Sequence, residues 1–329
     1  MDDTITTSPE EIPEIDHLAF SIYRCQDFME FKFKPKEFLV DSMIHRGDTV
    51  MIIGSPKSGK SLFVKQLICS ITSASPFLSK YSISEPTKVC YVQLEGGPLD
   101  TQDRLNRMSK PCPLIKENLS IYYSDPLFLQ DKNETREFIK TVEIGKNHQV
   151  VVIDGLYLCF AGSLSDDTVV RQLIGNMRII KNHFNCTLIL VHHTHKVRFD
   201  QDGQAITEGD SAIFGSQFLR AWPDHIFHLN TQKNSDIREL KCSTQRSGMI
   251  ETDIKMKLIQ PNPLYFETLD EVPKGVVYDA WKTKIDGYLK GTISGSAKTF
   301  EIIKGTGIPR SSFYYVIGKI KFIKQAILP

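Results

Sequence analysis

The octapeptide GSPKSGKS at residues 54–61 constrains the fold of this chain more than any other feature. It matches the pattern G-x-x-x-x-G-K-[ST], and the apolar run at 49–53 before it has the character of a short strand. The apolar positions after it, Leu62, Phe63, Leu67, Ile68 and Ile71, have the spacing of one helix face. A strand, a glycine-containing turn and a helix in this order predict a phosphate-binding loop.

Each part of this loop has a physical role. Glycines let the backbone turn tightly enough to aim its N–H groups at a polyphosphate. The start of the helix adds partial positive charge, Lys60 reaches the β- and γ-phosphates, and the Ser61 hydroxyl can bind Mg²⁺. The predicted nucleotide-binding residues are Gly54, Ser55, Pro56, Lys57, Ser58, Gly59, Lys60, Ser61 and Leu62. We therefore expect the chain to bind a nucleoside triphosphate.

The sequence between residues 49 and 195 alternates strand-like apolar runs with helical patterns. The predicted strands are 50–53, 89–94, 119–122, 150–153 and 188–192, and the predicted helices are 60–72, 99–108, 134–144 and 167–184. This alternation predicts an α/β fold with a parallel sheet covered on both faces. Beyond residue 222, short strands at 225–229, 238–242 and 254–258 without helices predict an antiparallel extension of the same sheet.

Composition and the positions of prolines predict three segments. They are an acidic N-terminal segment at 1–35, an ATPase-type α/β domain at 36–270 and a basic helical domain at 271–329. Prolines 261, 263 and 273 place the second boundary. Residues 1–30 carry a net charge of −7 and residues 275–329 a net charge of +6, within a total of +1. No apolar run is long enough to span a bilayer, and the seven cysteines are scattered without a C-x-x-C pair. We expect a cytoplasmic protein with no membrane partner.

The basic C-terminal segment has the pattern of a helix-turn-helix. Residues 297–303 and 308–320 are candidate helices separated by the turn Gly305-Thr-Gly307. Arg310 would then face nucleic acid. A small helical cap or an oligomerisation segment explains the same pattern equally well, and the basic charge is equally consistent with an ordinary solvated surface.

Polar residues follow several of the predicted strands at the end where a phosphate would lie. Asp154 ends the run QVVVID and is placed to hold Mg²⁺, while Glu95 after the second strand can polarise an attacking water. His193, in the run LILVHHTHK, can sense the terminal phosphate. Arg246 is the preferred candidate for a cation that reaches a neighbouring subunit's nucleotide. Lys241 and Arg220 are the next candidates for that role.

The histidines also raise the possibility of a zinc site. His192, His193 and His195 lie close together in sequence, with His225 and His228 as further candidate ligands. Consecutive strand residues point to opposite faces, so His192 and His193 cannot easily share one ion. The sequence therefore favours a phosphate sensor over a zinc site here.

Taken in order, the phosphate loop, Glu95, the strand ending in Asp154 and the run VHHTHK resemble the RecA-type ATPases. The chain looks most like the branch of RepA-like plasmid-replication hexameric helicases, near the DnaB-like helicases, over residues 36–260. The resemblance implies a RecA-like core that binds ATP and Mg²⁺, with Lys60, Glu95 and His193 as catalytic residues. It also implies Ser61 and Asp154 as the metal-binding residues and Arg246 as an arginine finger acting in trans.

The resemblance further implies a homo-hexameric ring on single-stranded DNA that works with other replication proteins. Lys196 and Arg198 fall in the segment 196–218, where the family has a mobile loop facing the central channel, and Arg310 is the third candidate for nucleic-acid binding. Pro56 and Lys57 within the phosphate loop depart from many relatives. The finger motif around Arg246 is a loose match.

The sequence is therefore consistent with three functions. The first is an ATP hydrolase that drives a DNA helicase in the replication of a plasmid, phage or related element. The second is a non-translocating ATP-dependent switch that binds DNA or a protein partner in recombination or regulation. The third, a small-molecule kinase, has the phosphate loop in its favour but lacks an acceptor-site pattern.

Overall fold

The structure of the protein is a computed structural model. The structure describes residues 24–30, 32, 35–108, 114–123, 127–143, 147–194, 198–199, 205–206, 216–231, 235–246 and 253–269. The chain divides into two compact units, residues 1–37 and 38–329. The described helix of the first unit is α1 (Cys25–Glu30). The predicted helix-turn-helix, with Arg310, lies outside the described residues.

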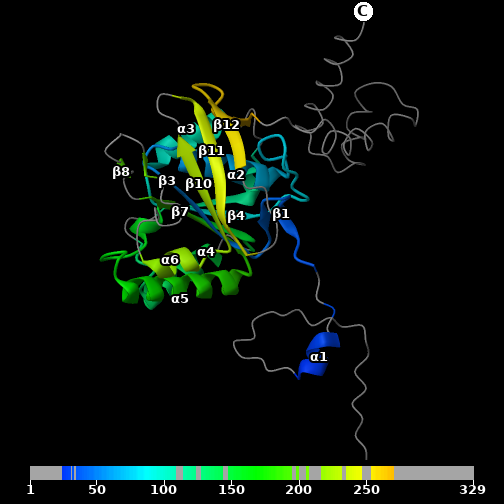
Figure 1. Cartoon of the computed structure of the whole chain (residues 1–329), viewed down its shortest axis with the longest axis vertical. Coiled ribbons are helices and arrows are strands. Elements are labelled where there is room, and N and C mark those ends of the chain that lie inside the picture. The colour runs from blue at the N-terminus through cyan, green and yellow to red at the C-terminus, as the bar shows by residue number, and fades with distance from the viewer. Residues whose placement is uncertain are drawn as a thin grey trace, which may run out of the picture. The chain divides into compact units, whose positions relative to one another are not determined.

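The second unit is built on a nine-stranded sheet (Figure 1). Its strands, in spatial order, are β13 (Tyr265–Thr268), β12 (Asp253–Ile259), β11 (Ile237–Gln245), β10 (His225–Thr231), β3 (Thr49–Gly54), β7 (Thr187–His193), β6 (Val150–Asp154), β4 (Val89–Gln93) and β5 (Leu119–Tyr123). Every neighbouring pair from β10 to β5 is parallel, and the pairs from β10 to β13 are antiparallel. The prediction of an α/β fold with a mostly parallel sheet is thus confirmed.

Two smaller strand pairs lie outside the main sheet. They are β1 (Phe38–Val40) with β2 (Ile44–His45), and β8 (Arg198–Phe199) with β9 (Ala205–Ile206). One prediction about the main sheet was wrong, because β10 pairs with β3 in parallel rather than antiparallel. The chain enters β10 through the short helix α6 (Gln217–Ala221), and this crossover brings it back to the edge where β3 begins.

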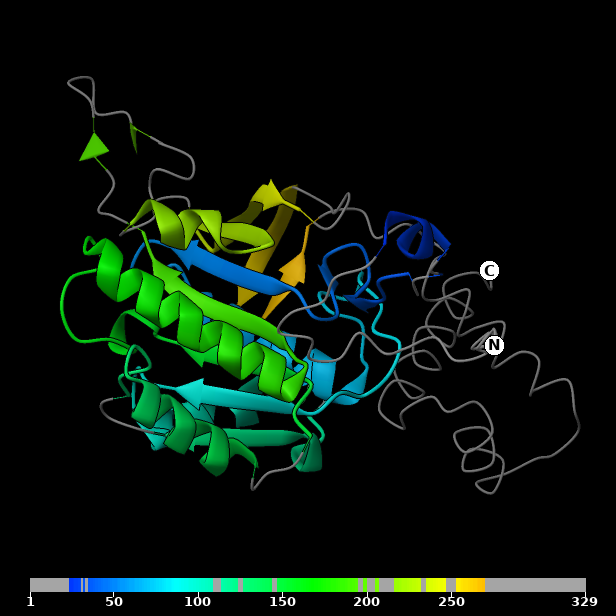
Figure 2. The ribbon, with the colours of Figure 1, turned by 90° about the horizontal axis from the view of Figure 1, so that it is seen from below.

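Helices cover both faces of the sheet, as the alternation of strands and helices predicts. The longer ones are α2 (Lys60–Ser73), α3 (Pro98–Met108), α4 (Lys132–Glu143) and α5 (Asp167–Phe184), and single 3-10 turns lie at Lys116–Asn118 and Leu156–Leu158. Val50 and Ile52 share one core with α2, whereas Met51 and Ile53 share the other with α4, α5 and α6. Figure 2 shows α5 lying along the strands on this second face.

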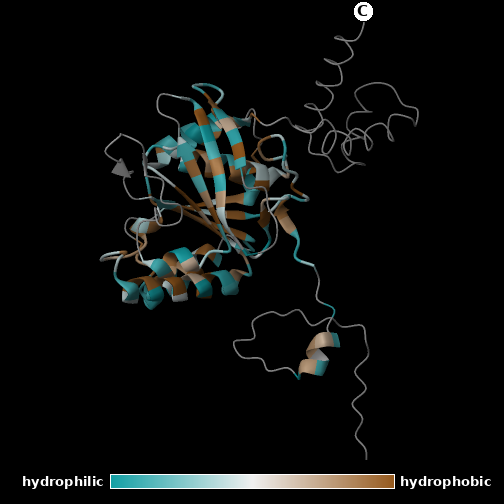
Figure 3. Cartoon of the chain, viewed as in Figure 1, coloured by the Kyte–Doolittle hydropathy of each residue, from teal (hydrophilic) through white to brown (hydrophobic). Residues whose placement is uncertain are grey.

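Burial on both faces explains why the central strands have unbroken apolar runs in place of an alternating pattern. All residues of β3, β4 and β6 are buried. The helix α5 is amphipathic, with a buried stripe that includes Leu173 and Met177. Its opposite side is largely hydrophilic (Figure 3).

Candidate nucleotide site

The candidate site begins where β3 ends and the phosphate loop turns into α2. Gly54 lies so close to β10 that an added Cβ would be 2.5 Å from the Leu229 carbonyl oxygen and 2.8 Å from Ser58 Oγ. Gly59, directly before α2, has a φ of +98°, which side chains larger than hydrogen rarely tolerate. Both glycines of the motif are therefore required by the backbone, independently of any ligand.

Lys60 begins α2 and points back over the loop. Its Nζ donates hydrogen bonds to the carbonyl oxygens of Gly54 (2.9 Å) and Ser55 (3.0 Å) and lies 3.2 Å from His193 Nδ1. Burial lowers the pKa of Lys60, while the charges of Glu95 and Asp154 oppose that shift. The ammonium group is thus held at the mouth of the loop beside the predicted sensor.

The ends of four parallel strands bring the other predicted residues to the same edge. Gly54 pairs with His193 across β3 and β7, and Asp154 pairs with Gln93 across β6 and β4. Glu95 follows two residues after Gln93. Residues from four separate segments therefore meet at the carboxyl edge of the sheet, where α/β proteins bind ligands.

His193 joins Glu95 to Lys60 through its two ring nitrogens. Its Nε2 lies 2.9 Å from Glu95 Oε1, and its Nδ1 faces Lys60 Nζ. The hydrogen bond from His193 is the main cause of a lowered pKa at Glu95, and a second hydrogen bond from Tyr157 acts in the same direction. Glu95 is therefore ionised at neutral pH and oriented by two neighbours.

Asp154 is fully buried, and both of its carboxylate oxygens are engaged. Ser61 Oγ donates to Oδ1 at 3.0 Å, and the Tyr91 hydroxyl donates to Oδ2 at 2.6 Å. Lys65 Nζ lies 3.9 Å from Oδ2 and also donates to the Tyr91 hydroxyl at 2.6 Å. Burial raises the pKa of Asp154, while Lys65, Tyr91 and Ser61 oppose this rise.

The donor set fits a nucleotide with Mg²⁺. Ser61 and Asp154 place a hydroxyl and a carboxylate oxygen side by side, and Mg²⁺ prefers such hard oxygen ligands. The loop backbone, the start of α2 and the Lys60 ammonium supply the positive charge that a polyphosphate needs. The remaining predicted loop residues, Pro56, Lys57 and Leu62, lie in the same turn and the first turn of α2.

Four residues that the sequence did not single out contribute to this site. Lys65 and Tyr91 hold Asp154, and Tyr157 contacts both Glu95 and the His193 ring, with ring centroids 5.1 Å apart. Arg238, on β11, donates from Nε to the carbonyl oxygen of Ser58 at 3.0 Å and so supports the loop from the side. For Lys65, the signal available in the sequence was a lysine among the apolar residues of the predicted helix 60–72. The other three had none.

Arg246 does not belong to this cluster. It follows β11 directly, and the register places Gln245 opposite His225 and His225 opposite Val50, at the edge where β3 begins. Its guanidinium donates to the carbonyl oxygen of Ala221. Lys241 is level with Ile53 and pairs with Glu239 at 3.3 Å, and Arg220 lies in α6.

The predicted nucleic-acid residues are mostly beyond the described part of the chain. Arg198 is the first residue of β8, whereas Lys196 and Arg310 lie outside the described residues. Of the histidines weighed for zinc, His193 contacts Lys60 and Glu95, and His225 lies at the opposite edge of the sheet. His195 lies outside the described residues.

A comparison with known protein families matches the part of the chain that contains the candidate nucleotide site. A family model described as an AAA domain matches residues 20–198, more than half of the chain. The chain belongs to the AAA domain family. The matched range of this AAA domain includes the phosphate loop, Glu95, Asp154 and His193. A comparison with curated proteins found no match.

Two solved structures are similar to this AAA domain in fold. One is described as an ATPase domain, with a TM-score of 0.52 and 16% sequence identity over 68% of this chain and 86% of that one. The other is a DnaB-like replicative helicase, described with its interactions with primase. Its TM-score is 0.52 and its identity 15%, over 68% of this chain and 58% of that chain.

These matches confirm the predicted RecA-like core and the predicted resemblance to DnaB-like helicases. In the described part of the chain, no helix has the length and apolarity needed to cross a bilayer.

Proposed function

We propose that this AAA domain is an ATP-hydrolysing motor that acts on single-stranded DNA, as a ring-forming helicase or helicase-like replication protein of a plasmid, phage or related element. One observation carries the proposal. Lys60, His193 and Glu95 form a continuous hydrogen-bonded row beside the Ser61–Asp154 pair, at the end of the phosphate loop. A kinase would need an acceptor site here, whereas a carboxylate bonded to a histidine suits water as the acceptor.

Each residue of the row has a defined part in hydrolysis. Lys60 would bind the β- and γ-phosphates, and Ser61 with Asp154 would hold Mg²⁺, which would neutralise charge on the phosphates. Glu95 is ionised and accepts the proton of the attacking water. Tyr157 and His193 hold the Glu95 carboxylate, so that it does not have to be ordered during the reaction.

His193 is suited to couple hydrolysis to movement. It contacts both the phosphate-binding Lys60 and the general base Glu95, and the chain continues from it towards Lys196 and Arg198. We infer that loss of the γ-phosphate changes the hydrogen bonds of His193 and thereby the position of the segment 196–218. In a hexameric ring, this segment would move single-stranded DNA through a positive channel.

The test is the ATPase rate of the full chain with and without single-stranded DNA, in parallel with filter binding over a range of salt. We expect stimulation by DNA and binding that weakens with salt, because Lys and Arg contacts to phosphate release counterions. Glu95→Gln should leave ATP binding within about threefold and lower the rate by roughly 10²-fold or more. A rate that does not respond to DNA, together with no salt-sensitive binding, would contradict the motor.

A strand-displacement assay separates the motor from the alternative function. A non-translocating switch in recombination or regulation would hydrolyse ATP without unwinding a forked duplex. The similarity in fold to the DnaB-like helicase supports the motor. The matched region spans 58% of the helicase chain, so the similarity alone does not distinguish a motor from a switch. ATP turnover without displacement would therefore favour the switch and leave the nucleotide site intact.

A further inference from the structure

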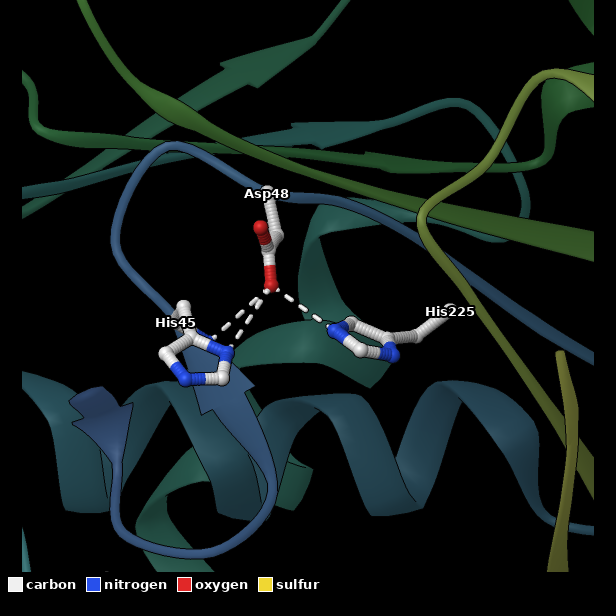
Figure 4. Close-up of side chains that lie close together, drawn as sticks. All are labelled: His45, Asp48 and His225. Atoms are coloured by element: carbon white, nitrogen blue, oxygen red, sulfur yellow. Dashed lines mark hydrogen bonds and ion pairs between the residues drawn. The ribbon is translucent and has the colours of Figure 1, made fainter. Parts of the chain in front are cut away.

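Three potential metal ligands meet at the edge of the sheet opposite the phosphate loop. His45 is the last residue of β2, Asp48 lies in the short turn between β2 and β3, and His225 is the first residue of β10 (Figure 4). His225 pairs with Val50 at the beginning of β3, whereas the phosphate loop follows the end of that strand. This cluster has no part in the proposed nucleotide chemistry.

The three side chains converge on one carboxylate oxygen. Asp48 Oδ2 lies 2.8 Å from His225 Nε2 and 3.5 Å from His45 Nδ1, and both rings turn a nitrogen towards it (Figure 4). One ligand atom from each residue lies within 4.8 Å of the others. Two imidazole nitrogens and a carboxylate oxygen therefore surround one small volume.

The cluster is inside the protein. Asp48 and His225 are fully buried, and His45 is 7% exposed. A buried carboxylate needs a nearby positive charge, because isolated charges are expensive to remove from water. Two imidazole nitrogens beside one carboxylate can supply that charge by holding a cation between them.

We propose that His45, Asp48 and His225 bind a divalent transition-metal ion, with zinc as the ion best matched to the ligands. Imidazole nitrogen is a ligand for zinc and other first-row transition metals, whereas Mg²⁺ and Ca²⁺ prefer sites made of oxygen alone. Zinc binds His and Asp at about 2.0–2.2 Å, which separates neighbouring ligand atoms by roughly 3.3–3.6 Å at tetrahedral angles. The ligand atoms of Asp48 and His225, now 2.8 Å apart, would have to separate by roughly 0.5–0.8 Å.

A metal at this place has a structural consequence. It would join β2 and the turn before β3 to the beginning of β10, next to the end of β11, which Arg246 follows. The Arg246 backbone N–H donates to the Asp224 carbonyl oxygen at 3.0 Å, one residue before His225. The ion would therefore stabilise the folded chain and fix the base of the proposed arginine finger.

The experiment uses the full chain without nucleotide. The apo protein, prepared with a chelator, is titrated with Co²⁺ and followed by visible absorption, and its Tm is measured with and without Zn²⁺. We expect one equivalent of Co²⁺ with d–d bands and without a thiolate charge-transfer band. Zn²⁺ at about 100 times its Kd should raise Tm by about 5 °C, because it binds only the folded state.

Two variants and one control assign the ligands. His45→Gln and Asp48→Asn keep the size of the side chain and should weaken Co²⁺ binding by about tenfold or more. His183→Gln is the matched control, because His183 is a surface histidine beside Glu143, and it should bind like the wild type. If either ligand variant fails to fold, the other variant and the wild-type titration still show whether the ion binds at this cluster.

Three outcomes would overturn the proposal. They are the absence of d–d bands and of a Tm shift in the wild-type chain, a thiolate band that places the ion at a cysteine, and equal binding by His45→Gln and His183→Gln. In each case the cluster is a hydrogen-bonded group in which His225 donates to Asp48. None of these results bears on ATP hydrolysis at the opposite edge.

Discussion

At the scale of single residues, the least expected feature of the nucleotide site is the buried lysine behind it. Lys65 is fully buried on α2, and its ammonium donates to Tyr91 and Gln93 while it lies 3.9 Å from Asp154. Burial lowers the pKa of Lys65 to about 8, and the Asp154 charge opposes that shift. The lysine charge compensates the buried carboxylate and, through Tyr91, leaves Asp154 Oδ1 directed at Ser61.

Replacing Lys65 by methionine should lower the free energy of unfolding by about 3 kcal/mol, because it leaves a buried carboxylate without its cation. Denaturant unfolding at neutral pH measures this loss. The double variant Lys65→Met/Asp154→Asn should recover part of it, since the uncompensated charge is then removed. Lys140→Met, at an exposed pair with Glu137, is the control and should change stability by about 0.5 kcal/mol or less. Equal losses in the two single variants would refute the compensation.

His148 gives a prediction about pH. It is buried against Ser120, with 2.9 Å between Nε2 and Oγ, and burial is the main cause of a pKa below the ordinary 6.5. Below pH 6.5 the unfolded chain takes up a proton that the folded chain resists, so this residue makes stability fall as pH falls. His148→Gln removes that proton uptake and should lose less stability than the wild type between pH 7.5 and 5.5 in urea unfolding. Parallel curves would show that His148 does not contribute.

At the scale of elements, the edge strand β13 packs against the phosphate loop and α2. Phe266 on β13 is buried, its ring lies against Phe63, and a Cβ on Gly59 would come within 3.1 Å of it. The side-chain amide of Gln66 bonds both the N–H and the carbonyl of Phe266, at 2.6 and 2.8 Å. The strand β13 is thereby fixed to α2, with Phe266 in contact with Gly59 of the loop.

Phe266→Ala should lower the free energy of unfolding by about 3–5 kcal/mol, the usual cost of removing a buried ring. It should also weaken ATP binding, because Gly59 loses its support. Calorimetric titration with a non-hydrolysable ATP analogue and thermal unfolding measure the two effects. Leu269→Ala, which changes an exposed side chain directly after the same strand, should leave both nearly unchanged. A stability loss with unaltered analogue affinity would show that β13 does not support the loop.

The sequence predicted those parts of the site that local patterns determine. Asp154 and His193 could be found because each ends a buried apolar run, and parallel strands end at one edge. Lys65 and Tyr157 could not, because their roles depend on which strands become neighbours. The strand β13 was missed because four residues after several prolines carry little periodicity. The direction of β10 was wrong because strand direction depends on the crossover before it and not on the residues of the strand.

At the scale of the whole molecule, the sheet separates two sets of functional candidates. The proposed ATP site lies at the carboxyl edge, and Arg246 lies level with the beginning of β3. Four residues of strand between Val50 and Gly54 correspond to roughly 13 Å. Arg246 also bonds the Ala221 carbonyl of its own chain. It is therefore placed away from its own phosphate loop, and any action on ATP must be directed at another subunit.

Mixing two inactive variants tests this arrangement. Lys60→Ala removes the phosphate-binding ammonium but keeps Arg246, whereas Arg246→Ala keeps the ATP site but lacks the finger. In a ring, an Arg246→Ala subunit next to a Lys60→Ala subunit receives an intact finger, so the mixture should regain ATPase activity that neither variant has alone. Removing an arginine finger typically costs 10³–10⁵-fold in rate, so even a small fraction of mixed interfaces should be detected above the background. Recovery should fall on dilution as the subunits separate. A mixture no more active than the sum of its components, at concentrations where light scattering shows assemblies, would place the arginine outside the catalytic interface.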